Sequence, residues 1–341
     1  MSAVSIRDVA HRAGVSVGTV SNAINRPNIV AASTVAKVQA AIDELGFIRN
    51  DAARQLRAGR SKTIGLVVLD VRNPFFTDVA RGAEDQAAIS GFTVLLGNSD
   101  ESPIREATYL DLFDEQRVHG VLISPFDDIT PRLVALRNRG IPAVLVDRSS
   151  GDESFSSVSV DDLEGGRMAV QHLIDIGRRR IAFIGGPMVI RQVADRLAGA
   201  RRAAAESDAR LEVIDIDALS VLEGRRAGAS IVARSTEDRP DAIFAANDLV
   251  AMGVLQALMM QGVDVRVPDE IALIGYDDID FASAAVVPLS SIRQPSALIG
   301  QTAVEILLDQ AENSEAPARQ IVFQPELVVR ESTSGSGAAR S

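Results

Sequence analysis

Four polar side chains stand directly after short apolar runs, at the points where buried strands would end. They are Asp147, Arg148, Asn247 and Asp277. Because the carboxyl ends of parallel strands meet at one edge of a sheet, side chains in these positions can converge on a single ligand. Carboxylates, an arginine and an amide can together hold several hydroxyl groups through charge-assisted hydrogen bonds.

Four further residues fit the same site. Arg196 lies on a predicted helix after Gly186, and Asn73-Pro-Phe-Phe leaves the first strand with two aromatic rings, Phe75 and Phe76. An aromatic ring can cover the apolar face of a sugar. The same side chains could instead form a self-satisfied ion-pair network with loop caps, and the residue types alone leave both interpretations open.

The chain carries none of the local motifs that mark catalysis, such as a glycine-rich dinucleotide loop, a Walker loop, an HExxH helix or a nucleophile elbow. Gly185-Gly186-Pro187 fits a plain strand-to-helix turn, since no Lys-Ser/Thr follows it. There is no cysteine, and the three histidines are far apart in sequence. We therefore predict no catalytic residue, no metal ligand and no cofactor.

Residues 5–25 have the pattern of two short helices around a tight turn. Ser5 and Ser16 are expected to cap the two helices, Gly14 suits a left-handed turn residue, and Val20 points back toward the first helix. This is the helix-turn-helix pattern, whose second helix enters the DNA major groove. An ordinary pair of antiparallel helices would look the same, so the pattern alone leaves that alternative open.

The segments that follow extend this head. A third amphipathic helix would close a three-helix core with one apolar face, Val35, Val38, Ile42 and Leu45. Residues 50–59 form a short helix-capable segment in which Leu56 and Arg57 have no core to join. Residues 1–60 carry eight basic and four acidic side chains, a net charge of +4, which leaves −15 for residues 61–341. A basic head on an acidic body places the phosphate-facing surface in the head.

From Ser61 onward, strands and helices alternate, and this predicts parallel sheets covered by helices on both faces. The predicted strands are Thr63–Leu69, Phe92–Leu96, Gly120–Ile123, Ala143–Val146, Ser157–Val160, Ile181–Ile184, Glu212–Ile216, Ala242–Ala245, Ile271–Ile274 and Gln320–Phe323. The predicted helices are Phe75–Ser90, Glu106–Gln116, Arg132–Arg139, Leu163–Ile176, Val193–Glu206, Glu223–Ala233, Leu249–Gln261 and Ala297–Gln310. Two such sheets with a cleft between them make a two-lobed ligand-binding module.

Six short motifs occur together near the start of the chain: Ile6-Arg-Asp-Val-Ala, Ala13-Gly-Val-Ser, Thr19-Val-Ser, Ile24-Asn, Leu45-Gly-Phe and Ala53-Arg-Gln-Leu-Arg. In this combination the chain resembles the LacI/GalR family of bacterial transcription regulators, the family of the lactose repressor. The resemblance extends over nearly the whole chain. It implies an all-α helix-turn-helix head (1–49), a hinge helix or linker (50–60) and an α/β two-lobed periplasmic-binding-protein-like core (61–330).

The resemblance also implies that the chain crosses between the lobes three times, near Asp161, Ser291 and Gln324. The N-lobe would then hold residues 61–160 and 292–323, and the C-lobe residues 161–291 and 324–330. The low-complexity tail 331–341 is expected to be disordered. It offers no heptad helix of the kind that tetrameric relatives add, so the resemblance implies a homodimer.

For the head, the resemblance assigns residues one by one. Val17, Gly18 and Asn22 would reach base edges from the exposed start of the second helix, where Asn22 can pair with adenine. Leu56 would enter the minor groove and kink the duplex, next to Arg57. Four other residues would contact DNA phosphates: Thr19, Ser21, Asn25 and Thr34. Ala31 departs from the usual serine that caps the third helix, so no phosphate contact is assigned to it.

For the core, the positions that match the family's effector contacts are Asp147, Arg196, Asn247 and Asp277, and Phe75 and Phe76 would line the pocket. Two features depart from purine-binding relatives. The run Val189–Gln192 replaces their polar segment, and Leu219 stands where several members place a stacking aromatic. Both departures favour a sugar or sugar derivative over a flat base.

The sequence therefore predicts a dimeric transcriptional repressor that binds a palindromic, double-stranded operator and responds to a small effector. No signal-like segment precedes Ser5 and no apolar run approaches the length of a membrane span, so we expect a cytoplasmic protein that sits on the nucleoid when bound to its operator. Two alternatives come from other classes, a transport-type sugar-binding protein and a sugar-acting enzyme. The former would need export, and the latter would turn over a candidate sugar.

Overall fold

The computed structural model describes residues 4–47, 61–149, 154–260, 262–263, 265–313 and 315–334. The chain separates into two compact units, Met1–Arg60 and Ser61–Ser341, and each is treated by itself. The whole of the predicted hinge, residues 50–60 with Leu56 and Arg57, lies outside the described residues.

The first unit is a three-helix head, as predicted. It consists of α1 (Ile6–Ala13), α2 (Val17–Asn25), the 3-10 turn η1 (Pro27–Ile29) and α3 (Ala32–Leu45). Its core is formed by small and β-branched side chains that let the helices approach closely: Val9, Ala10, Val20, Ala23, Val38 and Ala41. Val20 is fully buried, which confirms that α2 packs back onto α1.

The turn between α1 and α2 follows from its residue types. Gly14 has φ +67°, a left-handed conformation. Its steric cost is small for glycine, because glycine has no Cβ. Ser16 begins α2, and its Oγ accepts a hydrogen bond from the amide of Thr19 at 3.0 Å. Ser5 caps α1 in a capping box with Asp8, and its amide and hydroxyl both donate to the Asp8 carboxylate, at 2.8 and 2.7 Å.

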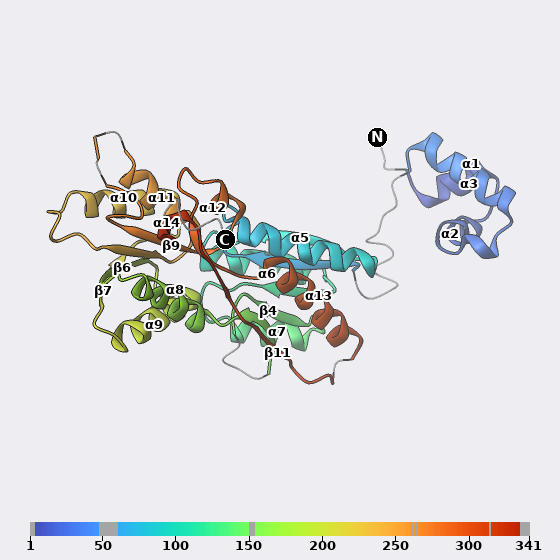
Figure 1. The fold of residues 1–341 in the computed structure, drawn as a ribbon. Helices are drawn as coiled ribbons and strands as arrows, with labels where there is room; N and C mark the ends of the chain where they lie inside the picture. The colour runs from blue at the N-terminus through green and yellow to red at the C-terminus, as the bar shows by residue number, and fades with distance from the viewer. Residues whose placement is uncertain are drawn as a thin grey trace. The chain divides into compact units, whose positions relative to one another are not determined.

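The second unit contains two six-stranded sheets, which confirms the predicted α/β fold class (Figure 1). The first sheet has the order β11-β5-β4-β3-β1-β2 and is parallel throughout. Its strands are β1 (Thr63–Val68), β2 (Thr93–Asn98), β3 (Gly120–Ile123), β4 (Ala143–Val146), β5 (Ser156–Val160) and β11 (Gln320–Phe323). The second sheet has the order β12-β10-β9-β8-β6-β7, and only β12 runs antiparallel to its neighbour. Its strands are β6 (Arg180–Gly185), β7 (Arg210–Asp215), β8 (Ala242–Ala245), β9 (Ala272–Asp277), β10 (Ser290–Arg293) and β12 (Glu326–Val328).

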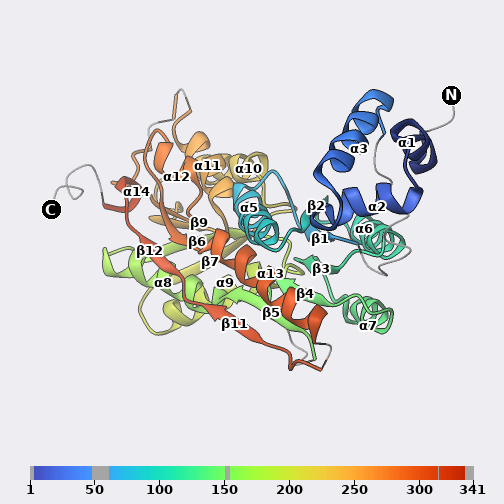
Figure 2. The ribbon, with the colours of Figure 1, turned by 90° about the vertical axis from the view of Figure 1, so that its right-hand side faces the viewer.

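Helices cover both faces of each sheet (Figures 1 and 2). In the first lobe α5 and α13 lie side by side against one face, while α6 and α7 pack on the other. In the second lobe α8 and α9 cover one face, and α10 and α11 cover the other. These helices are α5 (Pro74–Ile89), α6 (Pro103–Glu115), α7 (Thr130–Asn138), α8 (Asp162–Asp175), α9 (Arg191–Ala205), α10 (Val221–Val232), α11 (Asp248–Leu258) and α13 (Ser296–Glu312). The short helices α12 (Asp280–Ala284) and α14 (Glu331–Ser334) complete the unit.

The chain passes between the two sheets after β5, after β10 and after β11. The second passage differs from the expected one near Ser291, because Ser290–Arg293 form β10 and pair with β9 in the second sheet. The passage therefore follows Arg293. Ser290 and Ser291 are fully buried through side-chain hydrogen bonds, so this strand lacks the apolar run that would have revealed it.

The expectation of disorder from residue 331 onward is wrong for Glu331–Ser334, which form α14. Ser332 is fully buried, accepts a hydrogen bond from the Ser290 amide at 2.8 Å and donates to the Leu273 carbonyl at 2.6 Å. Thr333 Oγ1 lies 2.8 Å from His172 Nε2. Small hydroxyl side chains, which make this segment look low in complexity, anchor it to the second sheet. Residues 335–341 lie outside the described part of the chain.

Paired glycines let neighbouring helices cross at very short distances. A Cβ on Gly166 of α8 would lie 2.0 Å from the carbonyl oxygen of Arg196, and a Cβ on Gly199 of α9 would lie 1.9 Å from that of Leu163. The same arrangement joins α5 to α13 and α10 to α11, through Gly82 and Gly300, and Gly224 and Gly253. The backbone of Arg196 is therefore held directly against α8.

We expect Gly199→Ala to lower the free energy of unfolding by about 1–3 kcal/mol, because the added methyl group has no space against the α8 backbone. Urea unfolding of the full chain measures this loss. Arg201→Ala, an exposed change on the same helix, is the control and should stay within about 0.5 kcal/mol of the wild type. Equal midpoints for wild type and Gly199→Ala would contradict the close crossing.

Candidate functional site

The second helix of the head presents its first turns to solvent. Val17 is 42% exposed, and Gly18 and Asn22 are also exposed. Val20 and Ala23 on the opposite face are buried against the other helices. The residues predicted to reach base edges thus lie on the face that a helix-turn-helix head offers to the major groove.

The residues predicted to contact phosphates lie along α2, at Thr19, Ser21 and Asn25, and in the first turn of α3, at Thr34. The Thr19 hydroxyl is 2.9 Å from Ser16 Oγ, and Asn25 Nδ2 donates to the Ser21 carbonyl at 2.8 Å. Thr34 is half-buried in the first turn of α3. These contacts fix the side chains on the surface of the head before any partner binds.

A buried pocket lies between the two lobes of the second unit. It brings together eight of the nine residues predicted from the sequence: Asn73, Phe75, Phe76, Asp147, Arg196, Leu219, Asn247 and Asp277. Six further residues complete its lining: Leu69, Asp70, Glu101, Ile190, Gln192 and Val193. Both lobes contribute, so any change in their relative position changes the pocket.

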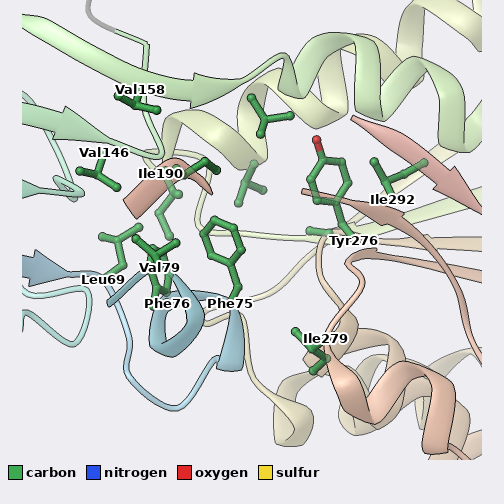
Figure 3. Packing of buried hydrophobic residues seen from close by; sticks show 14 of the residues in the cluster. Leu69, Phe75, Phe76, Val79, Val146, Val158, Ile190, Tyr276, Ile279 and Ile292 are labelled. Carbon is green, nitrogen blue, oxygen red and sulfur yellow. The ribbon is translucent and has the colours of Figure 1, made fainter. Parts of the chain in front are cut away.

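Two aromatic rings form the apolar part of the first-lobe wall. Asn73 Oδ1 accepts the amide of Phe75 at 3.1 Å and so begins α5, which places Phe75 and Phe76 on the first turn. The two ring centroids are 5.0 Å apart at 71°, an edge-to-face contact. Figure 3 shows both rings with Leu69 and Ile190 close by.

Arg196 is the only arginine of the lining and is almost fully buried. Its Nε lies 2.8 Å from Asp162 Oδ1, its Nη1 donates to the Ala246 carbonyl at 2.8 Å, and Nη1 is 3.9 Å from Asp277 Oδ1. The guanidinium also stacks 3.7 Å from the centre of the Tyr276 ring. Burial disfavours the charge, but Asp162 and the other nearby acidic groups outweigh it and raise the pKa of Arg196.

Asp277 joins the two lobes. It is the last residue of β9 and has φ +100°. Its carboxylate accepts hydrogen bonds from Asn73 Nδ2 of the first lobe and from Gln294 Nε2 of the connecting segment, both at 2.8 Å. Burial raises the pKa of Asp277, while Arg196 and the two amide donors lower it. Asp277, at the end of a strand of the second lobe, therefore contacts the first lobe and the segment that links the two lobes.

Asp147 forms the second contact between the lobes. Gln192 Nε2 of α9 donates to Asp147 Oδ2 at 2.9 Å, whereas Asp147 Oδ1 and Gln192 Oε1 are buried acceptors without a partner in the described part of the chain. Burial, followed by repulsion from Asp162, raises the pKa of Asp147 well above its usual value. Both unpartnered oxygens belong to residues of the pocket lining.

Asn247 is held by the helix that follows it. Its Oδ1 accepts the amide of Val250 at 2.9 Å and begins α11, and the residue is 2% exposed. The adjacent Asp248 points away to bond with Ser291 Oγ and the Ile279 amide, at 2.8 and 2.9 Å. Only Asn247 of this pair lines the pocket.

Arg148, which the sequence also predicts for the site, does not line this pocket. Its Nη1 donates to the carbonyl of Asp127 at 2.7 Å. Asp147 has φ +58°, so the chain turns sharply after β4. Adjacent side chains at such a turn point in different directions, and only Asp147 faces the pocket.

Asp70 and Glu101 are lining residues that the sequence reasoning missed, although both follow a strand of the first sheet as the predicted residues do. Asp70 is paired with Arg72, whose Nε lies 2.9 and 3.0 Å from its two carboxylate oxygens. Glu101 is held by its backbone, because its amide donates to the Leu69 carbonyl at 3.1 Å. Burial, then repulsion from Asp70, raises the pKa of Glu101 to about 7.

The residues that the structure describes contain neither a metal centre nor a membrane-spanning helix. No group of three or more histidine, cysteine or acidic side chains could hold a metal ion. None of the helices in this part of the chain has the length and apolar character needed to span a bilayer.

Comparisons with known proteins agree with this architecture. A family model described as "Bacterial regulatory proteins, lacI family" matches residues 5–50, and one described as "Periplasmic binding protein-like domain" matches residues 170–333. The HTH-type transcriptional repressor PurR of Photobacterium profundum is 35% identical over 335 residues, which cover 96% of this chain and 98% of that protein. This chain belongs to the LacI family of bacterial regulatory proteins.

Solved structures agree with this assignment. This LacI-family chain is 32% identical to the transcriptional regulator CelR in its cellobiose complex, with a TM-score of 0.72 and coverage of 96% of this chain and 99% of CelR. It is 29% identical to the Lac repressor dimer bound to operator and the anti-inducer ONPF, with a TM-score of 0.82 and coverage of 97% and 99%. It is therefore a transcriptional regulator with a DNA-binding head and an effector-binding core, and its relatives are repressors rather than enzymes.

The raised pKa of Glu101 predicts how the stability of this LacI-family regulator depends on pH. A carboxyl whose pKa is higher in the folded state favours folding most below its unfolded pKa, near 4.5, and loses this contribution as the pH rises through about 7. Glu101→Gln carries no such charge. Its free energy of unfolding should therefore rise relative to wild type between pH 5 and pH 8.

Urea unfolding at several pH values in this range measures the difference. Glu115→Gln, an exposed change at the end of α6, is the control and should follow the wild-type profile. A pH-independent difference between Glu101→Gln and wild type would show that the Glu101 carboxyl has an ordinary pKa.

Proposed function

We propose that this LacI-family regulator is a homodimeric repressor that binds a palindromic operator and is controlled by a small sugar-like effector between its lobes. It would act in the cytoplasm, on the nucleoid. The observation that carries the effector part is the convergence of Asp147, Arg196, Asn247 and Asp277 with two aromatic rings in one buried pocket. A buried arginine with several carboxylates and amides suits the hydroxyl groups of a sugar.

Two aliphatic residues of the lining favour a sugar over a flat base. Ile190 is 1% exposed and Leu219 is partly buried, and neither offers the aromatic face on which a base would stack. The rings of Phe75 and Phe76 meet edge to face and leave no pair of parallel planes to hold a base. The relative CelR was solved with cellobiose, which supports the same choice.

For the operator, we assign base contacts to Val17, Gly18 and Asn22, which the head exposes on α2. The phosphate contacts are assigned to Thr19, Ser21, Asn25 and Thr34. Leu56 and Arg57, which lie outside the described residues, are assigned to the centre of the operator, with Leu56 in the minor groove. Two heads related by two-fold symmetry would read an inverted repeat.

Apolar side chains on the second lobe support a subunit contact. Met252, Leu255, Met259 and Met260 of α11 and the following turn line a surface groove with Val286, and Val286 is 85% exposed. Exposed apolar groups gathered in one patch commonly mark a protein interface. The Lac repressor, similar over nearly the whole chain, was solved as a dimer on its operator.

The regulation we propose is a shift between two arrangements of the lobes. Asn73 with Asp277, and Asp147 with Gln192, join the lobes through hydrogen bonds made by the pocket residues themselves. An effector that bonds to these side chains must replace or rearrange the contacts and so change the angle between the lobes. The N-lobes of a dimer would then face each other differently, which sets whether the two heads can bind together.

Selection from a pool of random DNA duplexes with the full-length protein tests this function. We expect an enriched inverted repeat, which becomes the probe for screening sugars and sugar phosphates. A single unpaired site would contradict the dimer. No enrichment, with and without the sugar mixtures, would contradict sequence-specific DNA binding.

Asn22→Ala should weaken binding to the selected operator by about 1–3 kcal/mol and relax the preference for one base pair in each half-site, because a bidentate base contact is lost. Fluorescence anisotropy with operators altered at single positions measures both effects. Asn28→Ala, an exposed asparagine of η1, is the control and should bind as wild type does. An unchanged base preference in Asn22→Ala would remove Asn22 from the contacts we assign.

Asp277→Asn should weaken binding of the screened effector about 10- to 100-fold, the loss typical of a hydrogen bond to a charged group. Operator affinity without effector shows separately whether the weaker contact with Asn73 also changes the arrangement of the lobes. Calorimetry and anisotropy measure the two affinities. Asp85→Asn, an exposed change on α5, is the control, and normal effector binding by Asp277→Asn would place the effector elsewhere.

A further inference from the structure

The pocket is unusually rich in carboxylates. Its lining has four acidic residues, Asp70, Glu101, Asp147 and Asp277, and one basic residue, Arg196. The positive charge of Arg196 is matched by Asp162 at 2.8 Å, a fully desolvated partner just outside the lining. The lining itself therefore offers no uncompensated positive charge to an anionic ligand.

The hydrogen-bonding groups of the lining also favour acceptors over donors. Three of the four donor side chains of the lining already serve protein acceptors: Asn73 donates to Asp277, Gln192 donates to Asp147, and Arg196 donates to Asp162 and to a backbone carbonyl. The fourth is Asn247, whose Oδ1 accepts from Val250 and whose amide nitrogen stays available to a ligand. Asp147 Oδ1 and Gln192 Oε1, on residues 3% exposed, are acceptors without a partner among the described residues. Buried acceptors are costly to leave unpaired, so the pocket is suited to a ligand that brings donors.

Glu101 adds a third acceptor at the first-lobe end of the pocket. The basic group that acts on Glu101, Arg72, is occupied by Asp70 through Nε and by Asp100 through Nη2, both at 2.9 Å. Arg105 is likewise bound to Asp100, at 2.6 Å. In the part of the chain that the structure describes, no hydrogen bond or salt bridge reaches the Glu101 carboxyl.

We propose that the effector is a polyhydroxylated compound without an anionic group, either neutral or bearing an amine, and that Glu101 excludes phosphorylated and carboxylated compounds. This rests on the proposed effector site and specifies the charge of its ligand. Hydroxyl and ammonium groups donate to the three open acceptors. Phosphate and carboxylate groups have only acceptors to offer, and they meet the negative charge of Glu101 in a region of low dielectric.

The first test does not require the effector to be known. Small molecules from a bacterial extract are separated by ion exchange into cationic, neutral and anionic fractions, and each fraction is dialysed against the full-length protein. Mass spectrometry then identifies what the protein retains. Retention from the neutral or cationic fraction supports the proposal, and retention from the anionic fraction overturns it while leaving the effector site in place. No retention from any fraction contradicts the effector site itself.

The second test addresses Glu101. The retained compound is compared with its derivative in which one CH2OH group is oxidised to a carboxylate, a change that adds charge with little change in volume. Wild type should bind the acid at least about tenfold more weakly, and Glu101→Gln should reduce this discrimination about tenfold. Glu115→Gln is the control and should discriminate as wild type does.

Two further measurements separate the effect of the Glu101 charge from misfolding and from a purely structural role of Glu101. Cooperative urea unfolding of Glu101→Gln, together with its binding of operator DNA, shows that the variant is folded. If such a folded variant discriminates against the acid as strongly as wild type, Glu101 is not the excluding residue. Measurement at pH 5.5 and pH 8 gives a signature that a structural role would not, since discrimination by wild type should strengthen as Glu101 loses its proton near pH 7.

Discussion

The buried guanidinium of Arg196 is the interaction on which the arrangement of the core depends. A desolvated charge is tolerated only when it is paired and hydrogen-bonded, and Arg196 meets this condition with Asp162, a backbone carbonyl and the face of Tyr276. Its position is set by the close crossing of α8 and α9, where the two glycines let backbone touch backbone. Packing of small residues thus determines where a charge lies, and the charge determines where the neighbouring carboxylates can lie.

The polar side chains of the pocket fall into two groups that differ in how firmly the protein holds them. Residues that cap helices, such as Asn73 and Asn247, are fixed by the backbone that they cap. Asp147 and Gln192 instead bond to each other across the cleft and keep one open acceptor each. The first pair supplies a rigid frame, and the second pair supplies groups that can exchange a protein partner for a ligand. A binding site coupled to lobe movement needs both.

Much of the fold could be predicted because buried parallel strands read as continuous apolar runs. Gly120–Ile123, Ala143–Val146, Ala242–Ala245 and Gln320–Phe323 form strands with the predicted bounds. Two of the elements that were missed, β10 and α14, are stabilised by hydroxyl groups, and a periodicity of apolar residues does not reveal such elements. In the site, strand ends gave Asp147 and Asp277 but also Arg148, which does not line the pocket, because the direction of a side chain after a sharp turn depends on backbone angles. Asp70 and Glu101 follow the same strand-end rule and could have been found by it.

The three passages of the chain between the sheets mean that neither lobe is a continuous piece of sequence. The first sheet needs β11 from near the end of the chain, and the second needs β10 and β12 from either side of it. During synthesis the first sheet therefore cannot be completed until almost the whole chain has left the ribosome. Until then the edge of β5 is unpaired. Exchange of one lobe between relatives, by recombination or by design, would likewise require two separate segments to be replaced together. Effector preference in such a core is therefore expected to be passed on with the whole core and not with one lobe alone.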